Sequence, residues 1–75
     1  MNLARRKAIN AILSNLEAQS ELLAELLAEE QEAYDNMPEG LQSSEKGEAM
    51  EGGIQVLEDV HGSLESIIGD LQGEL

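Results

Sequence analysis

A regular spacing of apolar residues in the second half of the chain constrains the fold more than any other sequence feature. The spacing alternates between four and three residues, and one histidine takes part in it: Met50, Ile54, Leu57, His61, Leu64, Ile68, Leu71 and Leu75. Side chains at these steps share one side of an α-helix, and Val60 and Ile67 widen the stripe. We predict a helix over about residues 45–72, with a frayed end after Gly69.

The first half of the chain carries a second apolar stripe, built mostly from the strong helix formers Ala, Leu, Glu and Gln. Its members are Ile9, Ile12, Leu13, Leu16, Leu23, Leu26 and Leu27, with Tyr34 one heptad further on. The stripe is interrupted at Gln19 and Ser20. We predict a helix over about residues 2–36.

The connection between the two stripes is short. Pro38 lacks an amide hydrogen and restricts the residue before it, so the first helix is expected to end there. Gly40 is expected to adopt a positive φ. Ser43 or Ser44 is expected to cap the second helix. A turn over about residues 37–44 makes the two helices antiparallel neighbours.

The expected fold is therefore all-α: a single domain over residues 1–75, folded as an antiparallel helical hairpin. A domain of this size buries only about 60% of its unfolded surface, and no cysteine is present to support it. We expect two hairpins to pair as a homodimer in a four-helix bundle. The expected oligomer seam consists of Ile9, Ile12, Leu16, Leu23, Leu26, Ile54, Leu57, His61, Leu64, Ile68 and Leu71.

Residues 29–51 have a distinctive sequence pattern. The segment contains Glu29-Glu30-Gln31-Glu32-Ala33-Tyr34-Asp35-Asn36, Pro38, Leu41-Gln42, Ser44-Glu45, Gly47-Glu48 and Met50-Glu51. It resembles small uncharacterised acidic helical-hairpin proteins of phages and integrative elements of Gram-positive bacteria, which have an EEQEAYDN-P-LQ-SE-GE-ME pattern before Leu/Ile heptads. The following helix departs from that family at Gly52-Gly53, Gly62 and Gly69. The resemblance implies a mobile-element origin and a hairpin, and no activity.

The net charge of the chain limits the kinds of molecule that it can bind. Sixteen acidic and four basic residues give a formal net charge of −12. Such a chain repels nucleic acid and anionic membranes and attracts basic surfaces. No apolar stretch approaches the roughly 20 residues of a membrane span. We expect a cytoplasmic protein (in the host cytoplasm if phage-encoded) that binds neither nucleic acid nor membranes directly.

One row of carboxylates is the main candidate for a partner-binding face. We call Glu17, Glu21, Glu25, Glu29 and Glu32 the acidic ladder. Its first four members are one helical turn apart, so neighbouring carboxylates lie about 6 Å from each other. Regular negative charge of this kind is also what a nucleic-acid backbone presents. The ladder either imitates nucleic acid toward a basic protein surface or is simply a solvated face.

Glu58 and His61 are the only candidates for a metal site. Glu-x-x-His is the spacing of carboxylate-bridged di-metal four-helix bundles. The alternatives are a histidine in the apolar seam, hydrogen-bonded to a polar partner, and a pH-sensitive packing contact. Because a single short match carries little weight, no metal or cofactor is expected.

The basic residues Arg5, Arg6 and Lys7 are clustered near the N-terminus, and the fourth, Lys46, lies at the turn. The cluster is expected to meet Asp70 or Glu74 at the open end of the hairpin.

No catalytic constellation is apparent, because the chain has no cysteine, one histidine and no phosphate-binding loop. We expect a non-enzymatic protein-protein interaction module. It would be an acidic inhibitor, or nucleic-acid mimic, that blocks a basic, nucleic-acid-handling surface of a host protein. The alternative is a structural or adaptor coiled-coil protein that pairs through its apolar seam.

Overall fold

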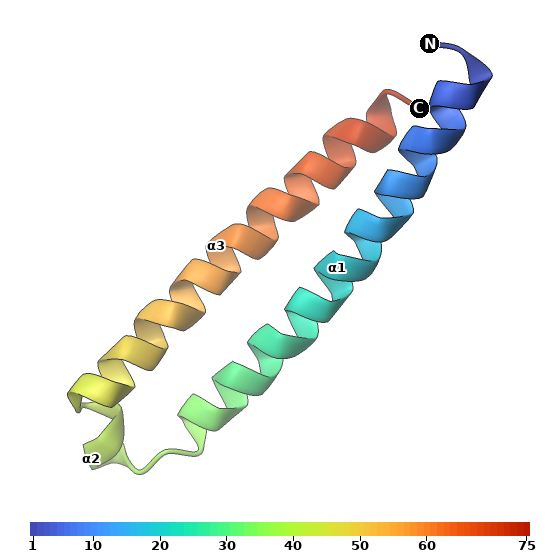
Figure 1. The fold of residues 1–75 in the computed structure, drawn as a ribbon. Coiled ribbons are helices and arrows are strands. Elements are labelled where there is room, and N and C mark those ends of the chain that lie inside the picture. The colour runs from blue at the N-terminus through green and yellow to red at the C-terminus, as the bar shows by residue number, and fades with distance from the viewer.

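The computed structural model describes all 75 residues and contains only helices: α1 (Leu3–Asp35), α2 (Glu39–Gln42) and α3 (Glu45–Gly73). The long helices α1 and α3 lie side by side and antiparallel, joined by α2 at one end, with both chain ends at the other (Figure 1). The hairpin is a rod with principal extents of 58 × 15 × 13 Å. The predicted all-α helical hairpin is confirmed.

Both ends of α1 follow from local sequence. Asn2 caps its start, and the Asn2 side chain accepts a hydrogen bond from the Arg5 backbone N–H at 2.8 Å. The helix ends at Asp35, three residues before Pro38. The predicted end ahead of the proline is therefore confirmed.

The connection contains a helical turn, α2, that no sequence pattern predicted. Pro38 precedes α2 with φ −56°, and its carbonyl accepts hydrogen bonds from the backbone N–H groups of Leu41 and Gln42 at 2.9 and 3.0 Å. No residue has a positive φ, so the expectation for Gly40 is wrong. Gly40 lies inside this helical turn, which reverses the chain without any left-handed residue. The Gln42 side chain donates to the Tyr34 carbonyl at 2.9 Å and so ties the connection to the end of α1.

The start of α3 is capped as predicted, by Ser44. Its side-chain oxygen accepts from the Gly47 backbone N–H at 3.3 Å, and its hydroxyl donates to the Leu41 carbonyl. Gly47 is buried, and a Cβ there would overlap the carbonyl oxygens of Leu41 and Gln42. Glycine is required at this position by the close approach of two backbone segments, not by an unusual φ.

The far end of α3 lies within one residue of its predicted position. The helix continues past Gly69 to Gly73. Ile68 is 5% exposed, and Leu71 and Leu75 are partly buried. Contact with α1 therefore orders a segment in which each glycine costs about 1 kcal/mol relative to alanine.

Two sets of residues face each other between the long helices, and we call them the contact residues. On α1 they are Ile9, Leu13, Leu16, Ser20, Leu23, Leu27, Glu30 and Tyr34, and on α3 and just beyond it Gly47, Met50, Ile54, Leu57, His61, Leu64, Ile68, Leu71 and Leu75. All are buried or partly buried, but only Leu13, Ile54 and Ile68 are buried apolar residues. A lone hairpin therefore has almost no core.

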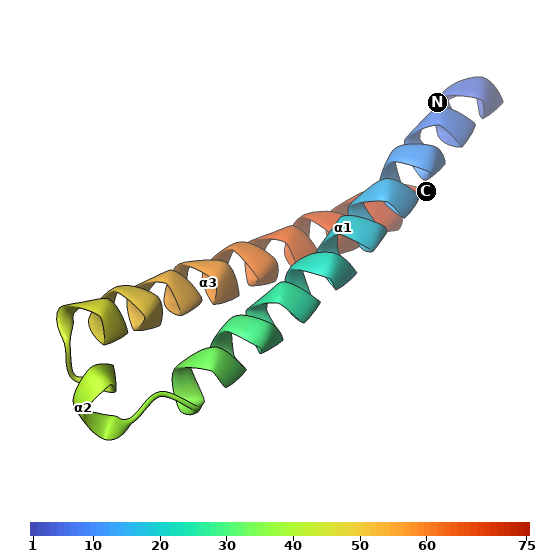
Figure 2. The same cartoon turned by 60° about the horizontal axis from the view of Figure 1, so that its bottom comes forward.

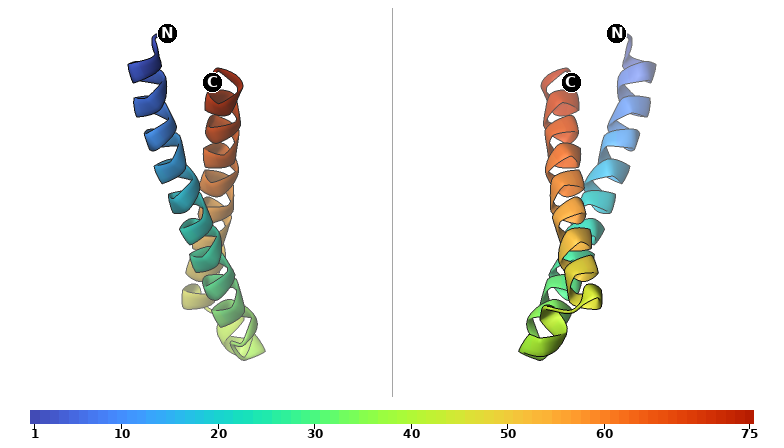
Figure 3. Two further views of the ribbon diagram at one scale, coloured as in Figure 1. Left: turned by 90° about the vertical axis from the view of Figure 1, so that its right-hand side faces the viewer. Right: turned by 90° about the vertical axis from the view of Figure 1, so that its left-hand side faces the viewer.

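The open end of the hairpin is the least packed part. The helices diverge toward the chain ends (Figure 3), and the first turns of α1 extend beyond the end of α3 (Figure 2). Residues 1–8 are all exposed, and Ile9 is the first to be partly covered.

Candidate interaction surfaces

The two broad faces of the hairpin differ in chemistry. Whether a residue comes directly before or directly after a contact residue determines on which face it lies. In a helix, the residue before a contact residue and the residue after it point about 100° to either side of it. An antiparallel pair has local two-fold symmetry, so the preceding residues of both helices share one face and the following residues share the other. This rule divides the hairpin into an apolar and a polar face.

The apolar face is formed by six large aliphatic residues, each one position before a contact residue. They are Ile12 (55% exposed), Leu22 (47%), Leu26 (49%), Val56 (59%), Val60 (49%) and Ile67 (55%). No large aliphatic residue directly follows a contact residue. Six of the nine exposed large hydrophobic residues thus lie on one side of the hairpin, and the other three, Met1, Leu3 and Leu41, lie at the ends of the rod.

The polar face carries the side-chain hydrogen bonds that join α1 to α3. The Ser20 hydroxyl donates to Glu65 Oε1 at 2.6 Å, and Gln72 Nε2 donates to Glu17 Oε1 at 2.8 Å. The Tyr34 hydroxyl donates to Glu51 Oε2 at 3.3 Å. In each contact the acidic residue directly follows a contact residue, which is the sequence signal by which Glu51 and Glu65 could have been found.

His61 lies beside this polar contact. Its Nε2 is 3.5 Å from Glu65 Oε1, the oxygen that also accepts from Ser20, and its side chain is 27% exposed. Glu58, the other candidate metal ligand, lies one turn nearer the hairpin's closed end and is exposed. No three His, Asp or Glu side chains are grouped so that they could hold a metal ion. The arrangement is a histidine in the contact surface with a polar neighbour, Glu65.

The fold alters the titration of Tyr34. Desolvation at the helix surface raises the pKa of the Tyr34 hydroxyl above its ordinary value of 10.0, and the charge of Glu51 and the hydrogen bond to it act in the same direction. The charge of Asp35 adds to this shift. Every cause favours the protonated phenol, the form that donates to Glu51.

The acidic ladder is exposed along its whole length. It does not stay on one face, however, because each step of four residues advances about 40° beyond a full turn. Glu17 and Glu21 directly follow the contact residues Leu16 and Ser20, on the polar face. Glu29 directly precedes the contact residue Glu30 and therefore lies on the side of the apolar face. From Glu17 to Glu29 the ladder therefore winds about 120° around the outer side of α1, and the three-residue step to Glu32 turns back by about 60°.

The basic residues do not form the contacts expected of them. The only close approach between oppositely ionisable groups is that of His61 and Glu65, so Arg5, Arg6 and Lys7 pair with neither Asp70 nor Glu74. The divergence of α1 from α3 at the open end separates these groups (Figure 3). Four cations are thus left without a carboxylate partner within the hairpin, Lys46 being the fourth.

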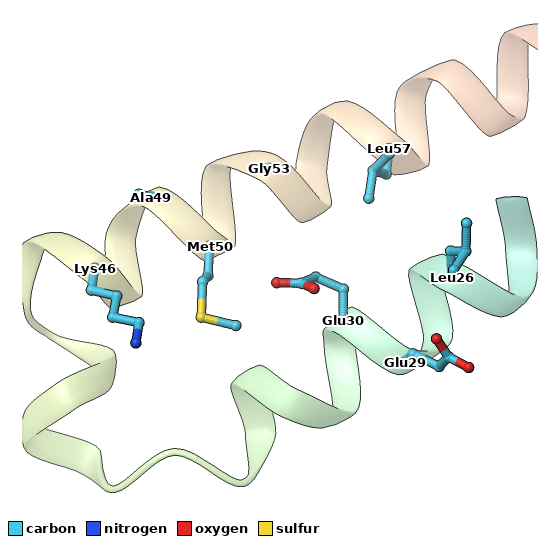
Figure 4. Close-up of a pocket in the computed structure, with 8 residues that line it drawn as sticks. All are labelled: Leu26, Glu29, Glu30, Lys46, Ala49, Met50, Gly53 and Leu57. Atoms are coloured by element: carbon cyan, nitrogen blue, oxygen red, sulfur yellow. The ribbon is translucent and has the colours of Figure 1, made fainter.

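Each face has one open hollow. That on the apolar face has a volume of about 540 Å³ and is lined by Leu26, Glu29, Glu30, Lys46, Ala49, Met50, Gly53 and Leu57 (Figure 4). That on the polar face has a volume of about 330 Å³ and is lined by Glu17, Ser20, Glu21, Glu65, Ile68, Gly69 and Gln72.

Glu30 is a contact residue that was absent from the predicted apolar stripe. It continues the heptad column of Ile9, Leu16 and Leu23, and its side chain extends into the space between α1 and α3 (Figure 4). The heptad count alone could have placed this carboxylate in the contact surface.

The predicted oligomer seam contains two kinds of residue. Nine of its eleven members are contact residues, used between α1 and α3 of one hairpin. Ile12 and Leu26 lie on the apolar face instead, beside four aliphatic residues that the predicted seam omitted: Leu22, Val56, Val60 and Ile67.

Comparison with known proteins adds no relative to this description. No protein-family model matches the chain, and no curated protein or solved structure is significantly similar to it. No helix of the hairpin is long and apolar enough to cross a lipid bilayer.

Proposed function

We propose that this chain is a non-enzymatic protein-interaction module. In this proposal the acidic ladder binds a basic, nucleic-acid-handling surface of a host protein and blocks it. The observation that carries the proposal is that the ladder carboxylates are exposed and that none is paired with a cation of the chain. Only Glu17 is engaged at all, by the side chain of Gln72. The other four are available to an external cation.

The charge balance supports a basic partner over a nucleic acid. The net charge of −12 repels phosphates over a distance set by the salt concentration, and it attracts a basic protein over the same range. The ladder costs helix stability, because like charges four residues apart repel by a few tenths of a kcal/mol per pair. A mobile-element origin and a cytoplasmic location belong to the same proposal.

The experiment removes the charge of two carboxylates of the acidic ladder, Glu21 and Glu25. The hairpin is immobilised, and a host protein that it retains is identified and measured again with Glu21→Gln/Glu25→Gln. If both carboxylates contact cations at exposed sites, each contact contributes about 1 kcal/mol and the pair about 30-fold in affinity. Glu58→Gln/Asp70→Asn removes the same charge from α3 and serves as the matched control.

The outcomes separate the proposal from its alternative. A nucleic-acid mimic binds less tightly as salt rises and competes with a duplex oligonucleotide for its target. If the ladder variant binds as well as the wild type, the acidic ladder is not the working surface. The alternative is an adaptor that pairs through apolar contacts, and the exposed aliphatic residues of the apolar face favour it. Its affinity would change little with salt.

A further inference from the structure

We propose that the apolar face is a docking surface for a second copy of this chain, and that the two hairpins lie head to tail, each turn end beside the other's open end. This inference does not depend on the ladder's target, and of the ladder residues only Glu29 borders the apolar face. It begins from an imbalance within one hairpin. Three large aliphatic residues are buried, whereas six of those on one face alone are about half exposed. Apolar patches of this kind on a small protein mark interaction sites.

The size of the face is appropriate for a stable dimer. The hairpin measures 58 by 15 Å across one broad side, a projected area of roughly 900 Å², and stable complexes bury about 800 Å² per partner. The aliphatic residues occupy the middle of this side, from Ile12 to Leu26 on α1 and from Val56 to Ile67 on α3. A second hairpin laid along the rod would cover all six.

The contact residues also need a second layer. Leu16, Leu23, Leu57 and Leu64 are only partly buried by the opposite helix. Two further helices above the apolar face would cover these leucines together with the six aliphatic residues and complete a four-helix bundle. The polar face does not offer this, because Glu17, Glu51 and Glu65 would be buried with it.

The hollow beside Gly53 fits an incoming side chain. It lies on the apolar face. Leu26, Met50 and Leu57 form its aliphatic lining, whereas Glu29, Glu30 and Lys46 also border it (Figure 4). A Cβ at Gly53 would meet nothing within 4 Å, so glycine there leaves room between α1 and α3 that the hairpin itself does not fill. An aliphatic side chain of the second copy would occupy the part beside Leu26 and Leu57.

A second copy suits this face in charge as well as shape. Between the aliphatic residues the face carries uncharged side chains, including Asn15, Gln19 and Ser63. Two copies of a chain with net charge −12 repel each other, but the contact itself would bring few carboxylates together. A basic partner, by contrast, would be drawn to the carboxylates elsewhere on the hairpin.

The ends of the rod decide the orientation. Residues 29–51, at the turn end, contain eight acidic residues and one lysine, a net charge of −7. The open end combines three cations in residues 1–16 with the two acids Asp70 and Glu74 of the end of α3, a net charge of +1. If the two turn ends lay side by side, two segments with a net charge of −7 each would be adjacent and would repel each other. Head to tail, a two-fold axis near Leu22 carries residues 5–7 about 24 Å to its other side, to the end of α1 and the turn. The unpaired cations of each copy then meet the acidic end of the other.

The first test is mass in solution with matched variants. We expect light scattering of the full chain to report twice the monomer mass at tens of micromolar. Leu26→Glu/Val60→Glu should raise the dissociation constant at least ~100-fold, because the dimer would bury four uncompensated carboxylates against aliphatic groups. Ser14→Glu/Ser66→Glu adds the same charge away from the apolar face and should leave the dimer intact. A monomer mass for the wild type, or an unchanged dimer in Leu26→Glu/Val60→Glu, overturns the proposal.

The second test measures orientation and does not depend on those variants folding. The chain has no cysteine, so Leu41→Cys, at an exposed site in α2, carries a single spin label. Head-to-tail packing should separate the two labels by a distance near the 58 Å length of the rod. A separation of about 20–30 Å, a few interhelical spacings, would show that the turn ends lie together and would overturn the head-to-tail arrangement. Neither test uses a target protein, so failure here is distinct from failure of the acidic-ladder proposal.

Discussion

The Ser20 hydroxyl donates a 2.6 Å hydrogen bond to Glu65 Oε1, and these two residues come from the middle of the contact between α1 and α3. Ser20 is 2% exposed, although it interrupts an otherwise aliphatic stripe. A polar residue at one contact position favours the alignment that gives it a partner over alignments shifted by a heptad. The break in the stripe thus specifies how the two helices are aligned.

Removing this contact should weaken the hairpin modestly. Ser20→Ala eliminates a hydrogen bond to a charged group, but Glu65 is 55% exposed at its side chain and can return to water. We expect a loss of about 1 kcal/mol in the free energy of unfolding, measured by urea denaturation at a fixed protein concentration. Ser66→Ala, at an exposed position with no hydrogen bond, should change it by less than about 0.5 kcal/mol. Equal stability of the two variants would show that the Ser20 contact contributes nothing.

Glycine-to-alanine substitutions should have opposite signs at two positions of α3. Gly47→Ala places a methyl group against the carbonyl oxygens of Leu41 and Gln42, and backbone cannot move aside as a flexible side chain can. We expect a loss of about 1–3 kcal/mol, the usual cost of overpacking. In Gly62→Ala the new methyl group meets nothing within 4 Å. Thermal unfolding should show a gain of about 0.5–1 kcal/mol from helix propensity, and a gain at Gly47 would contradict the close approach.

The raised pKa of Tyr34 predicts the direction in which stability changes with pH. The folded state raises the pKa of its hydroxyl above the ordinary 10.0, so the folded chain holds this proton more firmly than the unfolded chain. The associated stability is fully present below about pH 10 and is lost as the pH rises through the folded value. Because Tyr34 is the only tyrosine and there is no tryptophan, absorbance of the phenolate reports it alone.

Replacing Glu51, which accepts the hydrogen bond from Tyr34, tests what raises the pKa of the Tyr34 hydroxyl. Glu51→Gln removes both the charge and the charged acceptor, so the pKa of Tyr34 should move back toward 10.0. Asp70→Asn removes a charge at the far end of the hairpin and should leave the titration unchanged. A Glu51→Gln titration identical to the wild type would mean that Glu51 does not contribute and that desolvation and the charge of Asp35 raise the pKa of Tyr34.

Glu30 is a carboxylate in a column of aliphatic contact residues, so replacing it should stabilise the fold. Glu30→Leu continues the series of Ile9, Leu16 and Leu23. We expect a gain of about 1 kcal/mol, because a half-covered leucine recovers roughly half the value of a buried one. Glu25→Leu, on the exposed outer side of α1, should have little effect on denaturant unfolding. A loss of stability in Glu30→Leu would indicate that the carboxylate has a role between the helices.

The architecture could be predicted because two strong local signals agree. The four-three spacing places both apolar stripes, and Pro38 separates them, so the antiparallel hairpin follows from the sequence alone. The details of the connection could not be predicted. A short helical turn and a left-handed glycine both reverse a chain, and the choice depends on contacts such as that of Gln42 with the Tyr34 carbonyl.

The candidate surfaces were predicted less completely. The acidic ladder was identified by spacing, but its winding around α1 follows only when the helical angle is counted over several turns. The predicted pairing of Arg5–Lys7 with Asp70 or Glu74 was wrong because the helices diverge at the open end, which no local pattern encodes. The division into apolar and polar faces was present in the sequence, in the residues before and after each contact residue.

Both chain ends lie at the open end of the rod, and this has a consequence for single-chain versions of the protein (Figure 1). A tandem fusion joins residue 75 of one copy to residue 1 of the next. To place the copies in opposite directions, its linker must run the 58 Å length of the hairpin, which takes at least about 16 extended residues. A linker of a few residues holds both turns on the same side. Linker length therefore determines which geometry a tandem protein can adopt, without altering any residue of the hairpin itself.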